Sequence, residues 1–92
     1  MVRNFSVCMS VYKNDSPSYF KDAVHSIYTG QTEKPSEIIL VIDGPISGYL
    51  NDTINSLKQE IPVLKVLPLE QNMGHAIARQ TGLEAATNSL VA

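Results

Sequence analysis

Polar and glycine residues stand at the ends of three apolar or small-residue runs in this chain, and their types suit a small charged ligand. The three segments are SVYKND at 10–15, IILVIDGP at 38–45 and NMGHAIARQTGLEAA at 72–86. Each places hydroxyl, carboxylate, amide or glycine groups where a buried strand would end or a helix would begin. In an open parallel sheet, ligands bind in the crevice beyond the carboxyl ends of the strands. We therefore expect the three segments to meet at one sheet edge.

Strand patterns recur along the chain and would carry these segments. Phe5–Val11 alternates large apolar residues with small ones, which suits a strand covered on both faces. Ile38–Ile42 is continuously apolar and rich in β-branched residues, as central parallel strands are. Val63–Leu67 is bracketed by prolines and predicts a third strand, and Ser89–Ala92 predicts the start of a fourth.

Helical patterns fill the intervals between the predicted strands. Ser16 followed by Pro17 is a typical helix start. The apolar residues behind it follow helical spacing: Phe20, Ala23, Val24, Ile27 and Tyr28. A second helix is predicted from near Ser47, with an inward face of Leu50, Ile54, Leu57 and Ile61. A third is predicted to open after Gly74 and to run to about Asn88.

This alternation of strand and helix predicts an α/β fold. Right-handed crossovers would give a parallel sheet with helices on both faces, a Rossmann-like three-layer α/β/α arrangement. The gaps between elements are short, and no repeat or linker divides the chain. Residues 1–92 are therefore interpreted as one domain or part of one.

Composition narrows the classes of partner. Hydrophobic residues make up 43% of the chain and charged residues 17%, as in folded globular domains. The net charge is −2 and basic runs are absent, which argues against nucleic acid as a partner. The single Cys8 excludes an internal disulfide. No transmembrane segment or signal-peptide core is found, so the expected location is the cytoplasm, or peripherally the inner face of a membrane.

Three other nucleotide- or phosphate-related α/β families fit poorly. A dinucleotide-binding domain needs a glycine-rich turn after its first strand, and residues 12–17 contain no glycine. No P-loop motif GxxxxGK[ST] is present. A phosphoacceptor receiver needs paired acids after the first strand and a lone aspartate after the third, whereas Asp43 follows the second.

The ordered set of motifs resembles the front half of a family 2 glycosyltransferase of the GT-A fold. Members open with a strand like V-S-V-x-[ST]-x-Y-[NK], here Phe5-Ser-Val-Cys-Met-Ser-Val-Tyr-Lys-Asn-Asp15. Their second strand ends in an aspartate, here Val41-Ile-Asp-Gly44. They then show N-x-G and a helix with G-L-x-x-A, here Asn72-Met-Gly74 and Gly82-Leu-Glu-Ala85. The match covers essentially the whole chain.

The resemblance implies a nucleotide-binding site. Tyr12 would stack on the donor's base, which contributes about 1–3 kcal/mol; alternatively it fills space above the sheet. Asp43 would accept an N–H of the base, or serve as a capping or turn residue before Gly44. Ser10 and Val11 resemble positions that offer backbone groups to the base and ribose.

Two residues of the third helix complete the implied site. Gly74 would let the helix start approach ribose or phosphate, or is only a turn glycine with positive φ. Arg79 would balance diphosphate charge, or is a partly buried structural arginine.

The whole protein is accordingly expected to be an inverting glycosyltransferase that uses a nucleotide-diphosphate sugar, a UDP-sugar by preference, and a glycan or lipid-linked acceptor. This chain would be the donor-nucleotide-binding part, without catalytic or metal-binding residues of its own. The resemblance implies a divalent cation, Mn or Mg, held by a D-x-D motif beyond residue 92. The alternatives are a non-catalytic nucleotide-binding or regulatory module, and an interaction domain that keeps only the fold.

Overall fold

The computed structural model describes residues 5–86 and 89–90, in which strands and helices alternate as predicted. The strands are β1 (Phe5–Val11), β2 (Glu37–Ile42), β3 (Leu64–Pro68) and β4 (Ser89–Leu90). The helices are α1 (Pro17–Ile27), α2 (Gly48–Glu60) and α3 (His75–Ala85). Helix α3 ends before the predicted Asn88, because Ala86 is already extended with ψ of 136°. Asn88 and the last two residues of the predicted fourth strand lie outside the described residues.

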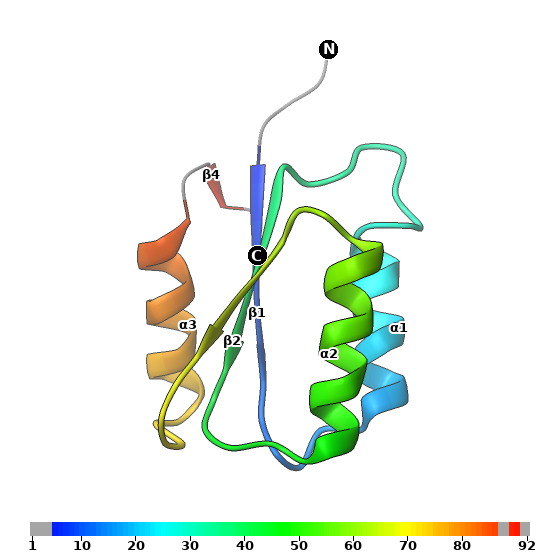
Figure 1. Cartoon of the computed structure of the whole chain (residues 1–92). Helices are drawn as coiled ribbons and strands as arrows, with labels where there is room; N and C mark the ends of the chain where they lie inside the picture. Colours follow the sequence, from blue (N-terminus) through cyan, green and yellow to red (C-terminus); the bar gives the residue numbers. More distant parts are fainter. Residues whose placement is uncertain (1–4, 87–88, 91–92) are drawn as a thin grey trace.

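The strands form one sheet in the order β3-β2-β1-β4, and each pairing is parallel. Val11 pairs with Ile42, and Ile42 pairs with Pro68. The carboxyl ends of β1, β2 and β3 therefore reach the same sheet edge. Helices α1 and α2 cover one face and α3 covers the other, which confirms the predicted three-layer α/β fold (Figure 1).

The face beneath α1 and α2 holds the larger core. Its buried members are aliphatic or aromatic side chains from both helices, the end of α2 and all three longer strands: Val11, Phe20, Val24, Ile38, Leu40, Ile42, Leu50, Ile54, Leu57, Ile61 and Leu64. The inward face predicted for α2 is confirmed. Ala23 of α1 is exposed instead of buried, because it lies at the margin of an arc centred on Phe20 and Val24.

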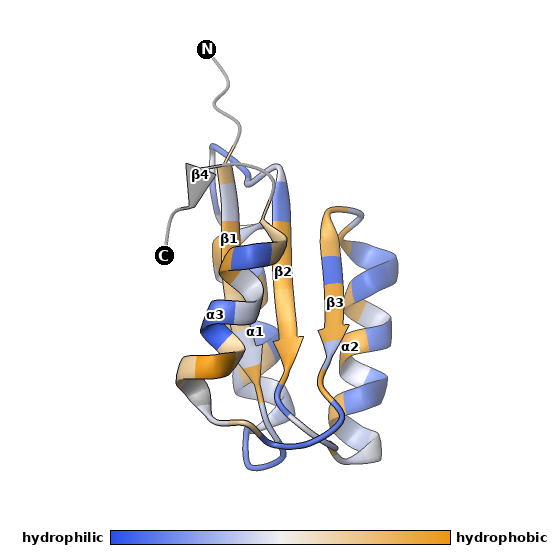
Figure 2. Ribbon diagram, turned by 90° about the vertical axis from the view of Figure 1, so that its left-hand side faces the viewer, coloured by the Kyte–Doolittle hydropathy of each residue, from blue (hydrophilic) through white to orange (hydrophobic). Residues whose placement is uncertain are grey.

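The face beneath α3 is thinner and made of smaller groups. Its buried residues are Ile39, Val41 and Ala78. A Cβ added at Gly82 would lie 3.3 Å from the Cys8 Sγ atom, so the helix packs close to the sheet there. Helix α3 lies over β1 and β2, whereas no described helix lies over this face of β3 (Figure 2).

The starts of α1 and α2 differ in their capping. Ser47 Oγ accepts a hydrogen bond from the Leu50 N–H at 3.2 Å, which caps α2. Ser16 occupies the N-cap of α1 but makes no side-chain capping bond, and its Oγ lies 3.2 Å from Ser18 Oγ. Pro17 starts α1 without needing a partner for a backbone N–H. Both predicted helix starts are confirmed.

Candidate functional site

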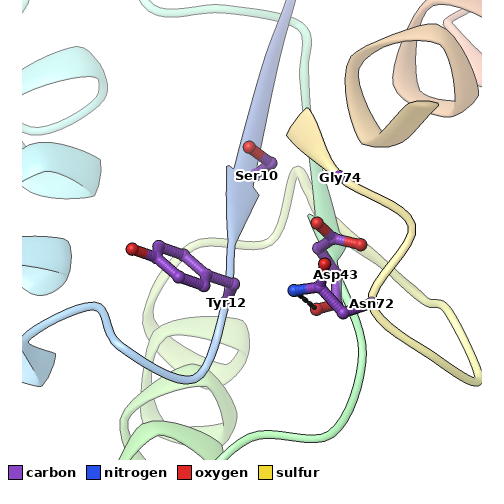
Figure 3. A pocket seen from close by; sticks show the side chains of 5 residues that line it. All are labelled: Ser10, Tyr12, Asp43, Asn72 and Gly74. Carbon is purple, nitrogen blue, oxygen red and sulfur yellow. Dashed lines mark hydrogen bonds between the residues drawn. The ribbon is translucent and has the colours of Figure 1, made fainter. Parts of the chain in front are cut away.

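A pocket of about 290 Å³ lies at the sheet edge where β1 and β2 end (Figure 3). It is lined by Ser10, Tyr12, Asp43, Asn72 and Gly74. These residues come from all three segments that were predicted to meet. The prediction that Tyr12, Asp43 and Gly74 share one edge is therefore confirmed, because parallel strands bring their carboxyl ends together.

Asp43 comes directly after β2 and is only 6% exposed. Its N–H donates to the Val11 carbonyl at 2.8 Å, which extends the β1–β2 pairing. Its Oδ1 accepts the backbone N–H of Met73 at 2.7 Å. Oδ2 makes no hydrogen bond to any residue that the structure describes. The carboxylate is thus held from one side and remains available as an acceptor on the other.

Gly44 allows the loop before α3 to pack against the end of β2. Its φ is +89°, and a Cβ there would lie 2.6 Å from the Asn72 nitrogen. Only glycine adopts this conformation readily while leaving room for the neighbouring backbone. Asn72 Nδ2 also donates to the Asp43 carbonyl at 3.3 Å. The two segments are therefore joined by backbone contact as well as by hydrogen bonds.

Tyr12 also lines the pocket. It comes directly after β1 and is 41% exposed, and its ring projects from the end of β1 away from Asp43 and Asn72 (Figure 3). Its backbone is held in a turn, because its N–H donates to Asp15 Oδ2 at 3.0 Å and its carbonyl accepts the Asp15 N–H at 3.0 Å. Asp15 thus fixes the turn that presents the ring.

Ser10 and Val11 take different positions. Ser10 lines the pocket. Val11 does not, because its side chain is 1% exposed in the core beneath α1 and α2. The Val11 carbonyl already accepts the Asp43 N–H, so this residue positions Asp43.

Gly74 lines the pocket at the start of α3. Its φ is +93° and its ψ is 159°, a region that side-chain-bearing residues rarely occupy. Nothing lies within 4 Å of where its Cβ would be. Glycine is therefore required here by conformation alone, which differs from the close approach at Gly44.

Arg79 is exposed on α3 and is not among the residues that line the pocket. Burial raises the pKa of the Cys8 thiol, the Glu37 carboxylate adds to this rise, and the Arg79 guanidinium opposes it. The charge of Arg79 therefore acts on the Cys8 thiol of β1. The structure places Arg79 beside the sheet without bringing it into the pocket.

Asn72 is a lining residue to which the sequence reasoning gave no role. The N-x-G motif marked its position, but its place in the pocket depends on the contact with Gly44. In residues 5–86 and 89–90, no group of three or more His, Cys, Asp or Glu residues could hold a metal ion. The pocket residues therefore supply no ligand set for the divalent cation that the resemblance implies.

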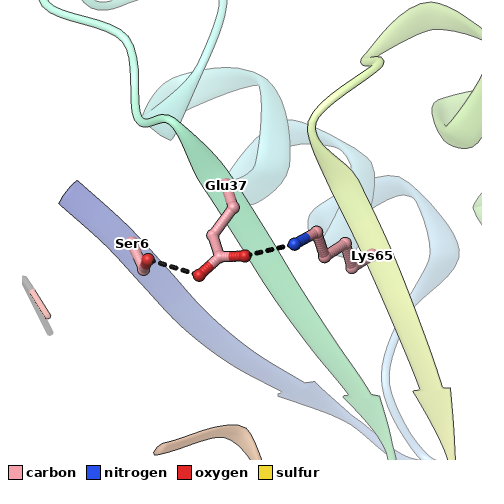
Figure 4. A network of polar contacts seen from close by, with 3 residues as sticks. All are labelled: Ser6, Glu37 and Lys65. Carbon is pink, nitrogen blue, oxygen red and sulfur yellow. Dashed lines mark hydrogen bonds and ion pairs between the residues drawn. The ribbon is translucent and has the colours of Figure 1, made fainter. Parts of the chain in front are cut away.

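A second polar cluster lies at the opposite edge of the sheet, and the sequence reasoning missed it. Glu37 Oε1 accepts the Ser6 hydroxyl at 2.6 Å, and Glu37 Oε2 accepts Lys65 Nζ at 2.6 Å (Figure 4). Glu37 and Ser6 are 2% and 0% exposed. The cluster links β1, β2 and β3 but takes no part in the pocket.

No helix among the described residues has the length and apolar character needed to cross a bilayer.

The sequence profile described as Glycosyl transferase family 2 matches residues 6–92. The UDP-Gal:alpha-D-GlcNAc-diphosphoundecaprenol beta-1,3-galactosyltransferase of Escherichia coli is 38% identical over 95% of this chain and 31% of its own length. The amylovoran biosynthesis glycosyltransferase AmsE of Erwinia amylovora is 35% identical over 96% of the chain and 32% of its own length.

The chain thus spans about a third of the length of these two relatives. A more distant match, polypeptide N-acetylgalactosaminyltransferase 3 of Taeniopygia guttata, is 32% identical over 84% of the chain and 13% of its own length. The profile match covers nearly every residue, including the pocket-forming segments. The chain belongs to glycosyl transferase family 2.

Proposed function

We propose that this chain binds the nucleotide of a nucleotide-diphosphate sugar, as the donor-binding part of a glycosyltransferase that transfers the sugar to an acceptor hydroxyl. One observation carries the proposal: an aromatic residue and a buried carboxylate, Tyr12 and Asp43, line one pocket. A nucleotide base has a flat face suited to the first group and polar ring edges suited to the second. The ring offers stacking and the carboxylate offers a hydrogen-bond acceptor.

Two kinds of interaction would hold the base: stacking and a hydrogen bond. Stacking on Tyr12 contributes about 1–3 kcal/mol and tolerates many bases. A hydrogen bond to the Asp43 carboxylate contributes about 1.5–3 kcal/mol, since the acceptor is charged. Tyr12 would therefore supply affinity and Asp43 selectivity.

The ribose and diphosphate would lie toward α3. Ser10 and Gly74 line the pocket on that side, and the start of α3 presents backbone N–H groups that suit an anion. Arg79 would act at longer range, because its side chain lies outside the pocket lining. Val11 would contribute by holding Asp43 through its carbonyl.

The donor and acceptor classes are carried over from the relatives. The Escherichia coli relative is named for UDP-Gal as donor and alpha-D-GlcNAc-diphosphoundecaprenol as acceptor. We extend to this protein a UDP-sugar donor and a glycan or lipid-linked acceptor, as in the assembly of a cell-envelope polysaccharide. The general base, and a divalent cation that would compensate the diphosphate charge, would be supplied outside the described residues.

Isothermal titration calorimetry with UDP tests the proposal. Tyr12→Ala and Asp43→Ala should each weaken UDP binding by about 1–3 kcal/mol. Tyr49→Ala is a matched control, because Tyr49 is 81% exposed on α2 and lines no part of the pocket. Unchanged affinity in both pocket variants, or no UDP binding by the unmodified protein, would refute the proposed function.

A further inference from the structure

The turn between β1 and α1 is held by Asp15. Its carboxylate Oδ2 accepts the Tyr12 N–H at 3.0 Å, and its own N–H donates to the Tyr12 carbonyl at 3.0 Å. Both bonds end on the backbone of Tyr12, so this residue is restrained on each side of its Cα atom. Asp15 is not among the residues that line the pocket. Its effect on the site therefore passes through Tyr12.

The neighbours of Asp15 in this segment do not provide the same restraint. Lys13 and Asn14 are exposed, and neither side chain makes a hydrogen bond to a residue that the structure describes. Ser16 is the N-cap of α1, but its hydroxyl makes no capping bond and lies 3.2 Å from Ser18 Oγ. The carboxylate of Asp15 is thus the side chain of this turn that ties it back to the end of β1.

We propose that Asp15 is a positioning residue for the donor nucleotide, which holds the backbone of Tyr12 in place before the ligand arrives. The inference rests on the proposed nucleotide-binding function and adds to it a residue that lies outside the pocket lining. Tyr12 is 41% exposed, so packing alone does not fix it. Ordering a mobile residue during binding lowers affinity, and a turn that is already ordered avoids this loss.

Two substitutions at this position separate the hydrogen bond from the charge. In Asp15→Ala the Tyr12 N–H loses its acceptor, and the affinity for UDP should fall about fivefold or more, as expected when one residue must be ordered on binding. Asp15→Asn keeps a side-chain oxygen that can accept the same N–H. Its affinity for UDP should stay within about twofold of that of the unmodified protein. An equal loss in both variants would overturn the inference.

A double-mutant cycle with Tyr12→Ala tests whether Asp15 acts through the tyrosine ring. Without the ring, an ordered turn no longer helps to bind the base. In that background Asp15→Ala should therefore change the affinity for UDP by less than about twofold. A general loosening of the structure would lower the affinity equally in both backgrounds. Equal losses, measured by calorimetric titration with UDP, would contradict the positioning role.

Asn14→Ala is the matched control, because Asn14 lies in the same turn, is exposed and makes no side-chain hydrogen bond to a described residue. It should leave the affinity for UDP unchanged, and a loss as large as that in Asp15→Ala would count against the inference. If Tyr12→Ala weakens UDP binding while Asp15→Ala does not, the inference is wrong and the nucleotide site stands. If the unmodified protein binds no UDP, both are wrong.

Amide hydrogen exchange tests the inference without any substitution. The Tyr12 N–H is bonded to Asp15, whereas the Asn14 N–H in the same turn has no hydrogen-bond partner among the described residues. Before UDP is added, and after correction for intrinsic rates, the Tyr12 amide should exchange at least about tenfold more slowly than the Asn14 amide. Equal exchange rates would show that Asp15 does not hold the turn in the free protein, which would overturn the inference.

Discussion

Strand β2 carries a buried carboxylate at each end, and the two are held in different ways. Glu37 begins the strand and has both oxygens engaged by side chains, Ser6 and Lys65. Asp43 comes directly after the strand and has one oxygen engaged by a backbone N–H. The first lies in a cluster that links three strands, and the second lines a pocket. Burial alone therefore does not distinguish a structural acid from a ligand-binding one.

The distinguishing property is the unused hydrogen-bonding capacity. A buried carboxylate is costly unless it is paired, so Glu37 with two partners is stable without a ligand. Asp43 keeps an open oxygen beside a cavity, and a ligand can complete its hydrogen bonding. The two edges also differ in what fixes them. Side chains fix the Glu37 edge, whereas backbone contacts at Gly44 and Met73 fix the Asp43 edge.

The largest expected effect comes from adding a methyl group at the Asp43 edge. Gly44→Ala should cost about 2–5 kcal/mol of unfolding free energy, because strain at φ +89° adds to a Cβ contact of 2.6 Å with the Asn72 nitrogen. Gly74→Ala is the matched control: its φ is +93°, but the added Cβ meets nothing within 4 Å. It should cost only the strain, about 1–3 kcal/mol. Urea denaturation measures both, and equal losses would contradict a backbone contact at Gly44.

A pair of isosteric substitutions tests the comparison of the two acids. Glu37→Gln should lower the unfolding free energy by about 1–3 kcal/mol, because an amide NH₂ would face Ser6 or Lys65 in a buried site. Asp43→Asn should cost less than about 1 kcal/mol, since its amide oxygen still accepts the Met73 N–H. The affinity for UDP should fall more in Asp43→Asn than in Glu37→Gln. If either variant lost both stability and affinity for UDP to a similar extent, the two edges would not differ in function as described.

The smallest effect concerns the Cys8 thiol, which lies on β1 beneath α3. Burial and then Glu37 raise its pKa, whereas Arg79 lowers it. The folded state therefore holds the thiol proton to higher pH than the unfolded state does. This contribution to stability is present below the unfolded pKa of about 8.5 and is lost as pH rises through the folded value.

The rate of Cys8 alkylation against pH measures this pKa in the folded protein. Glu37→Gln should move the titration to lower pH, and Arg79→Ala should move it to higher pH. Cys8→Ala should remove the corresponding loss of stability at alkaline pH. Identical titration curves in the three thiol-containing proteins would show that neither charge acts on Cys8.

The order of elements and the shared sheet edge could be predicted because they depend on local patterns. Continuous apolar residues marked β2, and serine and proline marked the helix starts. The exposure of Ala23 and the end of α3 could not be predicted. The first depends on the width of a packed interface, and the second on the extended backbone at Ala86. Glu37 was missed because a single acid before an apolar strand usually signals an exposed end.

Local patterns in the sequence were enough to predict that three polar segments border buried elements of a parallel α/β sheet, and therefore that Tyr12, Asp43 and Gly74 meet. Three further features emerged only from tertiary contacts: Asn72 joins the pocket, Val11 and Arg79 do not line it, and Asp43 presents one oxygen. The physical reason is the distance along the sequence between the residues that interact. Strand and helix patterns act over a few neighbouring residues, whereas hydrogen-bond satisfaction is settled by partners such as Met73, which lies 30 positions from Asp43.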